Sequence, residues 1–174
     1  MGMGNNKITT AQALKFARHD FLNELQLVLL YIDLDKLPEA KQKILETTDR
    51  MREVALLERL GLPAVEIWLT TFDWLYGAFS KTMTCTIASG IREADDTEVA
   101  KYLERLFSEM EKTLDPTSEY ETQIDVQASV AGWSITIVVL APLKKVFPEP
   151  IEFENFTVKE TISQNQWTFT ISGQ

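Results

Sequence analysis

The sequence predicts an α+β protein in which an N-terminal antiparallel helical hairpin precedes an α/β sandwich. Three observations lead to this fold class. Apolar residues recur at helical spacing through the first third of the chain, a break at Gly61 and Pro63 follows, and most segments after Thr82 alternate apolar and polar side chains. We expect the domain boundary at residue 62, which gives a hairpin over 1–62 and a sandwich over 63–174.

The first helix is expected from about Thr10 to Asp35. A stripe of apolar residues on one side of this helix consists of Leu14, Phe21, Leu25, Val28 and Ile32. Thr9 or Thr10 can cap its N-terminus, because a hydroxyl oxygen accepts a hydrogen bond from an amide that has no partner within the helix.

A second helix is expected from about Pro38 to Leu60, ended by Gly61 and Pro63. Its candidates for inward-facing residues are Leu37, Ile44, Met51 and Val54. Two helices cannot bury this much apolar surface between them. We therefore expect a homodimer in which two hairpins form a four-helix bundle. The alternative is that the second half of the same chain covers the hairpin.

The second half of the sequence predicts helices packed on one face of a mainly antiparallel sheet. Two helices are expected, an aromatic-rich one over Ala64–Ser80 and an amphipathic one over Asp96–Leu114. The expected strands are Thr82–Ser89, Tyr120–Val130, Trp133–Ala141, Phe156–Ser163 and Gln166–Ser172.

Composition excludes several classes of function. The chain has 17 Lys and Arg against 26 Asp and Glu, and its net charge of -9 does not fit nucleic-acid binding. Residues 1–62 carry nine basic and nine acidic side chains, so the whole of this charge lies in the second half. A single cysteine, Cys85, excludes an intramolecular disulfide and a Cys-based zinc site. We expect no cofactor or metal bound by the chain, no membrane span, no signal peptide and a cytoplasmic location.

His19 is the one histidine, so any imidazole chemistry belongs to it. It lies ~140° around the helix from Leu14, away from the apolar stripe and toward solvent. An exposed imidazole on a rigid helix suits a nucleophile, although an incidental surface histidine has the same pattern. Its neighbours on the helix surface include Lys15, Leu22, Asn23 and Gln26.

The string Arg18-His19-Asp20-Phe21-Leu22-Asn23-Glu24-Leu25-Gln26 resembles the phospho-acceptor box of the Spo-type two-component family. This family includes sporulation-initiation phosphotransferases and sensor kinases for citrate and related dicarboxylates. The resemblance implies that His19 accepts a phosphoryl group and that Arg18, Asp20 and Asn23 assist it. The sequence departs from the family at Glu24, where relatives carry a basic residue.

The same resemblance implies that the partners are receiver domains of response regulators, with Mg²⁺ held in the regulator's own site. We expect Lys15, Leu22 and Gln26 to contact them. The second half resembles a degenerate histidine-kinase ATP domain. No Asn lies in Asp96–Leu114, and the glycines after Gly90 are only Gly132 and Gly173, so the Gly-x-Gly segments are missing.

A phospho-acceptor histidine without an ATP site predicts a phosphorelay phosphotransferase. Such a protein moves a phosphoryl group from the aspartyl-phosphate of one regulator, through a phosphohistidine, to the aspartate of a second regulator, toward sporulation. Two alternatives remain open. The chain could be a sensor-type histidine kinase with an unorthodox nucleotide site, or a non-enzymatic dimeric scaffold that binds regulators.

Overall fold

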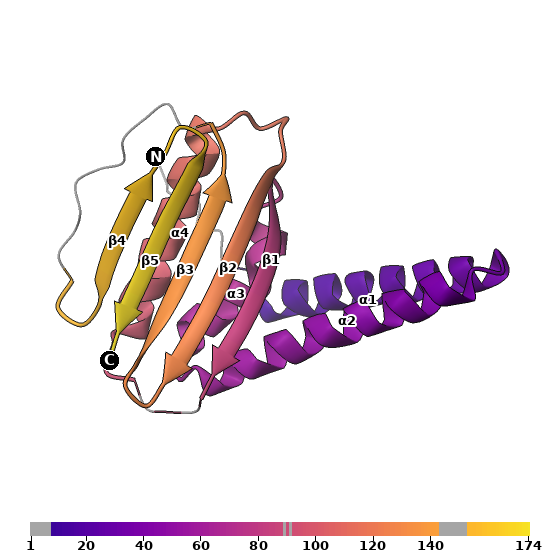
Figure 1. Ribbon diagram of the computed structural model, residues 1–174, viewed down its shortest axis with the longest axis horizontal. Coiled ribbons are helices and arrows are strands. Elements are labelled where there is room, and N and C mark those ends of the chain that lie inside the picture. Colours follow the sequence, from indigo (N-terminus) through magenta and orange to yellow (C-terminus); the bar gives the residue numbers. More distant parts are fainter. Residues whose placement is uncertain (1–7, 89, 91, 143–152) are drawn as a thin grey trace. The chain divides into compact units, whose positions relative to one another are not determined.

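The computed structural model describes residues 8–88, 90, 92–142 and 153–174 of the chain (Figure 1). The chain divides into two compact units, Met1–Ala55 and Leu56–Gln174. In the part of the chain that is described, no helix combines the length and the apolar character needed to cross a membrane.

The first unit is a helical hairpin, as the sequence predicts. Helix α1 spans Thr10–Asp33 and helix α2 spans Leu37–Leu56. Thr9 caps α1 in a capping box, in which its hydroxyl accepts from the backbone N–H of Gln12 and the Gln12 side chain returns to the Thr9 backbone. The tight turn includes Asp35 with a φ of 56°, a left-handed conformation that aspartate tolerates better than most residues.

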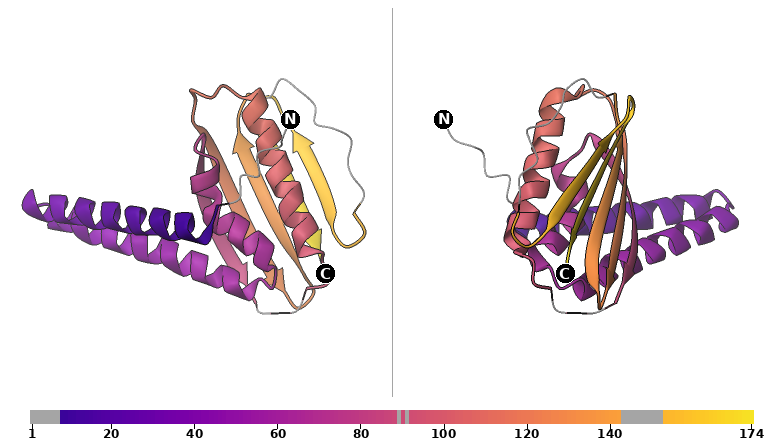
Figure 2. Two further views of the ribbon diagram at one scale, coloured as in Figure 1. Left: turned by 180° about the vertical axis from the view of Figure 1, so that it is seen from behind. Right: turned by 60° about the vertical axis from the view of Figure 1, so that its left-hand side comes forward.

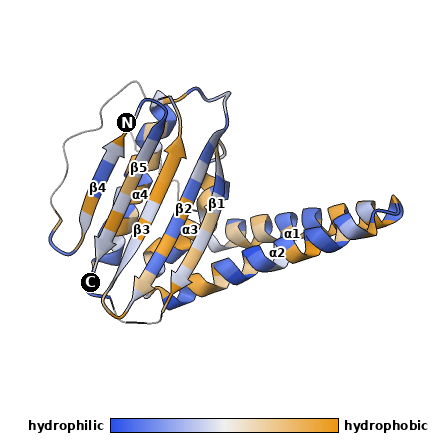
Figure 3. Cartoon of the chain, viewed as in Figure 1, coloured by the Kyte–Doolittle hydropathy of each residue, from blue (hydrophilic) through white to orange (hydrophobic). Residues whose placement is uncertain are grey.

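The seam between α1 and α2 differs from the predicted apolar stripe. Near the turn, the least exposed residues are Glu24, Val28 and Tyr31 on α1 and Ala40, Lys43 and Thr47 on α2. Of the residues expected to face inward, Leu14, Phe21, Leu25, Ile32, Leu37, Ile44 and Met51 are between 44% and 67% exposed. This exposure in a single chain agrees with the expectation that two helices alone cannot bury these residues, since they enclose only one narrow seam and polar side chains occupy part of it. Their burial by a second hairpin stays a prediction. Figure 3 shows hydrophobic positions along both helices.

The second unit is an α/β sandwich built on one five-stranded sheet (Figure 1). Its elements in chain order are a 3-10 turn η1 (Leu57–Arg59), α3 (Pro63–Leu75), β1 (Phe79–Ile87), α4 (Asp96–Thr113), β2 (Tyr120–Ser129), β3 (Gly132–Leu140), β4 (Thr157–Ile162) and β5 (Gln166–Gly173). The strand order is β1-β2-β3-β5-β4, with β1 parallel to β2 and the other neighbours antiparallel. This confirms the predicted mainly antiparallel sheet.

Two helix ends lie earlier than the sequence predicts. Helix α3 ends at Leu75 rather than Ser80, because the chain is already extended at Phe79, where it pairs with Tyr120 of β2. Helix α2 ends at Leu56 and gives way to η1. Gly61 then turns the chain with a φ of 76°. Only glycine fits here without strain, because a Cβ at this position would lie 2.7 Å from the backbone oxygen of Gly90.

Helices α3 and α4 cover one face of the sheet, as Figure 2 shows from behind. The core between them contains a cluster of aromatic rings, which includes Trp68, Phe72, Tyr76, Phe79 and Phe107. Leu57, Leu60 and Leu62 are fully or almost fully buried in the same core. These three leucines therefore belong to the second compact unit, Leu56–Gln174.

Candidate functional site

His19 lies in the middle of α1, a helix whose sequence contains neither glycine nor proline. Its backbone is therefore held in a regular helical turn with the side chain directed by that turn. The imidazole is 69% exposed, which confirms that it lies off any buried face. A partner molecule can thus reach the ring without any rearrangement of the helix.

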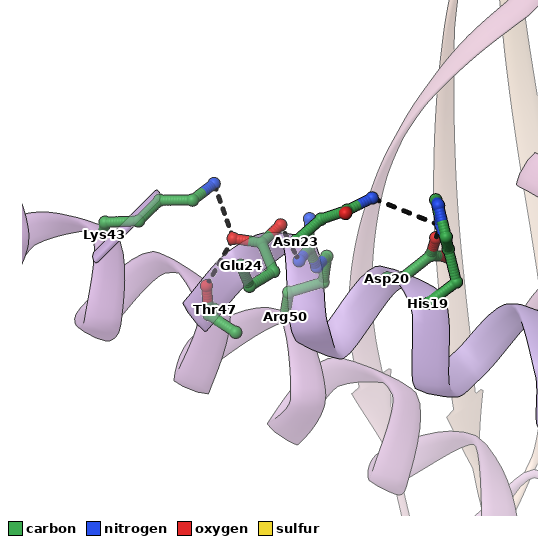
Figure 4. A network of polar contacts seen from close by, with 7 residues as sticks. All are labelled: His19, Asp20, Asn23, Glu24, Lys43, Thr47 and Arg50. Atoms are coloured by element: carbon green, nitrogen blue, oxygen red, sulfur yellow. Dashed lines mark hydrogen bonds and ion pairs between the residues drawn. The ribbon is translucent and has the colours of Figure 1, made fainter. Parts of the chain in front are cut away.

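Two neighbours contact the imidazole, and both contacts are made through Nδ1 (Figure 4). Asp20 Oδ1 lies 3.3 Å from Nδ1, and Asn23 Nδ2 lies 3.2 Å from the same atom. Among the described residues of the hairpin, none supplies a hydrogen bond to Nε2. The ring is therefore held at one nitrogen and open at the other.

The remaining residues predicted for the site lie on α1 around His19. Lys15, Leu22 and Gln26 precede or follow it by four, three and seven positions, which places them on the same helical face. Leu22 is 49% exposed. Arg18 and Lys15 are exposed cations that form no ion pair with a described residue. The predicted residues thus form one exposed surface with two free positive charges beside the imidazole.

Glu24 lies one residue beyond Asn23 but turns away from this surface to α2. Its carboxylate accepts hydrogen bonds from Arg50 Nη2 at 2.7 Å and Thr47 Oγ1 at 3.1 Å, and it pairs with Lys43 Nζ at 2.8 Å. Partial burial alone would raise the pKa of Glu24, but the hydrogen bonds from Arg50, Lys43 and Thr47 outweigh it and lower the pKa to about 2. Glu24 is ionised at neutral pH and links the two helices of the hairpin.

Sequence reasoning missed this network. The signal that could have revealed it is the spacing of Glu24, Val28 and Tyr31, which places a carboxylate in line with two residues of the seam. A glutamate in such a line needs a cationic partner on the facing helix, and α2 offers Lys43 and Arg50. The departure at Glu24 is thus accommodated inside the hairpin rather than on the face of His19.

The second unit offers no comparable site within its described residues. No cluster of His, Cys, Asp or Glu suitable for a metal ion occurs among the residues that the structure places. The buried side of α4 carries Val99, Ala100, Tyr102, Leu103, Leu106, Phe107 and Met110. On the side toward β4, the Tyr102 hydroxyl donates to Glu160 Oε1, and the Tyr102 ring packs against Phe153, which stacks on Phe156.

Comparison with known proteins finds a family model that matches the first part of the chain. Residues 3–60 match the family model described as "Sensor_kinase_SpoOB-type, alpha-helical domain". This match covers the whole of the candidate site on α1. No curated protein sequence matches the chain.

Three solved structures that are similar to the chain are histidine kinases at low sequence identity. Histidine kinase AdeS of Acinetobacter baumannii is 15% identical, with a TM-score of 0.44 over 90% of this chain and 97% of that one. The nucleotide-free catalytic domain of histidine kinase ThkA is 11% identical, with a TM-score of 0.47 over 66% and 91%. ThkA in complex with the response regulator protein TrrA is 10% identical, with a TM-score of 0.45 over 93% and 60%.

Proposed function

We propose that this chain is a phosphorelay phosphotransferase of the kind that acts in sporulation initiation. His19 takes a phosphoryl group from the aspartyl-phosphate of one response regulator and passes it to the aspartate of a second regulator. The observation that carries this proposal is the exposed imidazole, held through Nδ1 alone, on a helix within the segment that matches the Spo-type helical domain.

The chemistry requires little from the chain beyond a positioned nucleophile. Nε2 of His19 attacks the phosphorus, the N–P bond forms, and the bond between phosphorus and the aspartyl oxygen breaks as the carboxylate leaves. The second regulator's aspartate reverses these steps. Such transfers depend mainly on positioning and charge stabilisation. Mg²⁺ in the regulator's acidic site would supply much of that stabilisation, so no metal site is needed on this chain.

The surface around His19 suits a phosphorylated partner. Arg18 and Lys15 place beside the imidazole two cations that form no ion pair with a described residue, and an arginine can bind two phosphoryl oxygens at once. Leu22 adds an exposed apolar contact, and Gln26 adds an amide that both donates and accepts. We assign these four residues to receiver binding and phosphoryl stabilisation.

The exposed apolar residues of the hairpin support a homodimer. Soluble monomers rarely leave a long run of large apolar side chains in water. In α1 and α2 such residues include Leu25, Leu29, Leu30, Ile32 and Ile44, each at least 44% exposed. A second hairpin is the partner whose apolar surface matches this one by symmetry, and together they form a four-helix bundle.

An ATP-independent role is supported by the sequence of α4 and by its surroundings. This helix contains no Asn to bind magnesium and phosphates, and the chain has no Gly-x-Gly segment after it. Its inner side is filled with apolar side chains. The net charge of -9 arises entirely from residues 63–174, which disfavours a polyanionic nucleotide.

Label transfer tests the proposal. Receiver domains are phosphorylated with a radioactive small-molecule phosphodonor, purified from the donor, and mixed with the chain. We expect acid-labile, base-stable label on the wild type and none on His19→Ala. Because His19 is the only histidine, phosphohistidine can form at no other position. Label from ATP alone would assign a kinase instead, and receiver binding without label would assign a scaffold.

A further inference from the structure

Asp20 and Asn23 require opposite protonation of His19 Nδ1, so a neutral imidazole cannot hydrogen-bond to both at once. A neutral ring carries a single N–H, on either Nδ1 or Nε2. The Asp20 carboxylate can only accept, so its contact at 3.3 Å requires a proton on Nδ1. The Asn23 Nδ2 group can only donate, so its contact at 3.2 Å requires a lone pair on Nδ1. Each neighbour therefore stabilises a different tautomer.

The two tautomers differ in reactivity at the exposed nitrogen. With the proton on Nδ1, Nε2 presents its lone pair to an incoming phosphorus. With the proton on Nε2, that lone pair is absent from the exposed position, and attack must wait until the proton has left. The contact with Asp20 therefore favours the reactive form of the ring, and the contact with Asn23 favours the resting form.

We propose that Asn23, contrary to the assisting role that the resemblance implies for it, is a positioning residue that holds His19 in the resting tautomer, with the proton on Nε2, and that Asp20 opposes it. The effect on phosphoryl transfer rests on the proposed function, whereas the tautomer equilibrium does not. In the reactive form the Nδ1 proton stays on the ring while the N–P bond forms. The positive charge that develops on the ring then lies opposite the Asp20 carboxylate, and the departing aspartyl oxygen keeps the electron pair of the broken bond.

Nitrogen NMR of the full chain tests this directly, because His19 gives the only imidazole signals. The spectra are recorded on protein labelled with ¹⁵N-histidine at about pH 8, where imidazoles are ordinarily neutral. In Asn23→Ala we expect the ratio of the Nδ1–H form to the Nε2–H form to rise about threefold, as for the loss of one exposed hydrogen bond. Asn23→Asp replaces the donor with an acceptor and should raise the ratio further, whereas Asp20→Asn should lower it.

Gln42→Ala is the matched control. Gln42 Nε2 donates to Glu46 Oε1 at 2.9 Å, another exposed amide contact between residues four apart on the same hairpin. This variant should leave the His19 tautomer ratio unchanged. A ratio that stays constant in Asn23→Ala, or that falls, overturns the proposal, since a fall would mean that the Asn23 oxygen accepts from Nδ1–H.

Phosphoryl uptake separates this inference from the proposed function. Asn23→Ala should take label from a phosphorylated receiver up to about threefold faster than wild type, in proportion to the fraction of His19 in the Nδ1–H form. If the ratio rises but uptake is unchanged or slower, Asn23 does not restrain transfer and the inference fails. If the ratio rises and no receiver labels any variant, the tautomer assignment stands and the phosphotransferase function fails.

Discussion

Glu24 of α1 and Arg50 of α2 are joined by an ion pair in which Oε1 and Nη2 lie 2.7 Å apart. The carboxylate is only 17% exposed and also contacts Lys43, so one anion holds two cations of the facing helix. Figure 4 shows these groups converging on Glu24 from α2, while Asn23 and His19 interact on α1. Two consecutive residues of α1 therefore have different roles: Asn23 contacts His19 in the candidate site, and Glu24 binds α2 across the hairpin seam.

The first prediction is that Glu24 makes the hairpin sensitive to acid. Its pKa of about 2 lies below the ordinary value of 4.5, so its contribution is complete above pH 4.5 and is lost as pH falls toward 2. This difference corresponds to at most about 3 kcal/mol, and since Arg50 is 62% exposed we expect about 1–2 kcal/mol. Glu24→Gln should cost this amount at pH 7 in urea unfolding followed by far-UV circular dichroism, and much less at pH 2.

Asp49→Asn provides the control for Glu24. Asp49 pairs with Arg52 at 2.9 Å, but both side chains are about 70% exposed, at 69% and 73%. Its loss should change the free energy of unfolding by less than about 0.5 kcal/mol at any pH. Equal costs for the two variants would show that the Glu24 network does not stabilise the hairpin.

A second prediction concerns Asp96, which caps a helix other than its own. Its carboxylate accepts from the backbone N–H groups of Ala64 and Val65 at 2.6 and 3.0 Å, in the first turn of α3. Asp95 meanwhile caps α4 through the Glu98 N–H. Asp96→Ala leaves two α3 amides unpaired and should lower the free energy of unfolding by about 2 kcal/mol. Asp96→Asn keeps one acceptor and should cost roughly half as much; the assay is chemical denaturation followed by tryptophan fluorescence.

The periodicity of the sequence was sufficient for most of the sandwich. The predicted amphipathic helix over Asp96–Leu114 buries its apolar side in the core of the second unit, where Val99, Leu103, Leu106, Phe107 and Met110 are at most 4% exposed. The predicted strands after Tyr120 agree with β2 to β5 within about one residue at each end. The hairpin was harder, because its apolar stripe and its seam share only Val28 on α1. An apolar period shows that a face avoids water but does not say which partner covers it.

For the candidate site, too, the sequence predicted which residues lie near His19 but not which contacts they make. Helical spacing placed His19 in solvent and put Lys15, Leu22, Asn23 and Gln26 on its side of α1. It could not show that Asp20 and Asn23 both reach Nδ1, since that depends on side-chain torsions rather than on position along the helix. The role of Glu24 depends on which residues of α2 face it, and thus on the register of the two helices across the turn.

A third prediction concerns Arg18 and Lys15, the two cations beside His19. If Arg18 binds the phosphoryl oxygens, Arg18→Ala should reduce kcat/KM for transfer by about 10- to 100-fold, as for a lost charge-assisted hydrogen bond. Lys15→Ala should reduce it about two- to fivefold, through weaker attraction of the receiver, with a smaller dependence on salt. Lys41→Ala removes an exposed cation from α2 and serves as the control. An Arg18→Ala rate that matches the Lys41→Ala rate in label transfer would remove Arg18 from the site.

The fourth prediction is that the hairpin mediates dimerisation. Leu25 is 44% exposed on α1, although its position belongs to the apolar stripe of the sequence. Leu25→Glu would place a charge in the core of a four-helix bundle, where an unpaired ion is too costly to bury. Sedimentation velocity at micromolar concentration should therefore give a dimer for wild type and a monomer for Leu25→Glu. Leu140, on β3, is 39% exposed, so Leu140→Glu introduces the same charge at a similarly exposed leucine outside the hairpin. A dimer that survives Leu25→Glu but not Leu140→Glu would assign the interface to the sandwich, and a monomeric wild type would exclude the bundle.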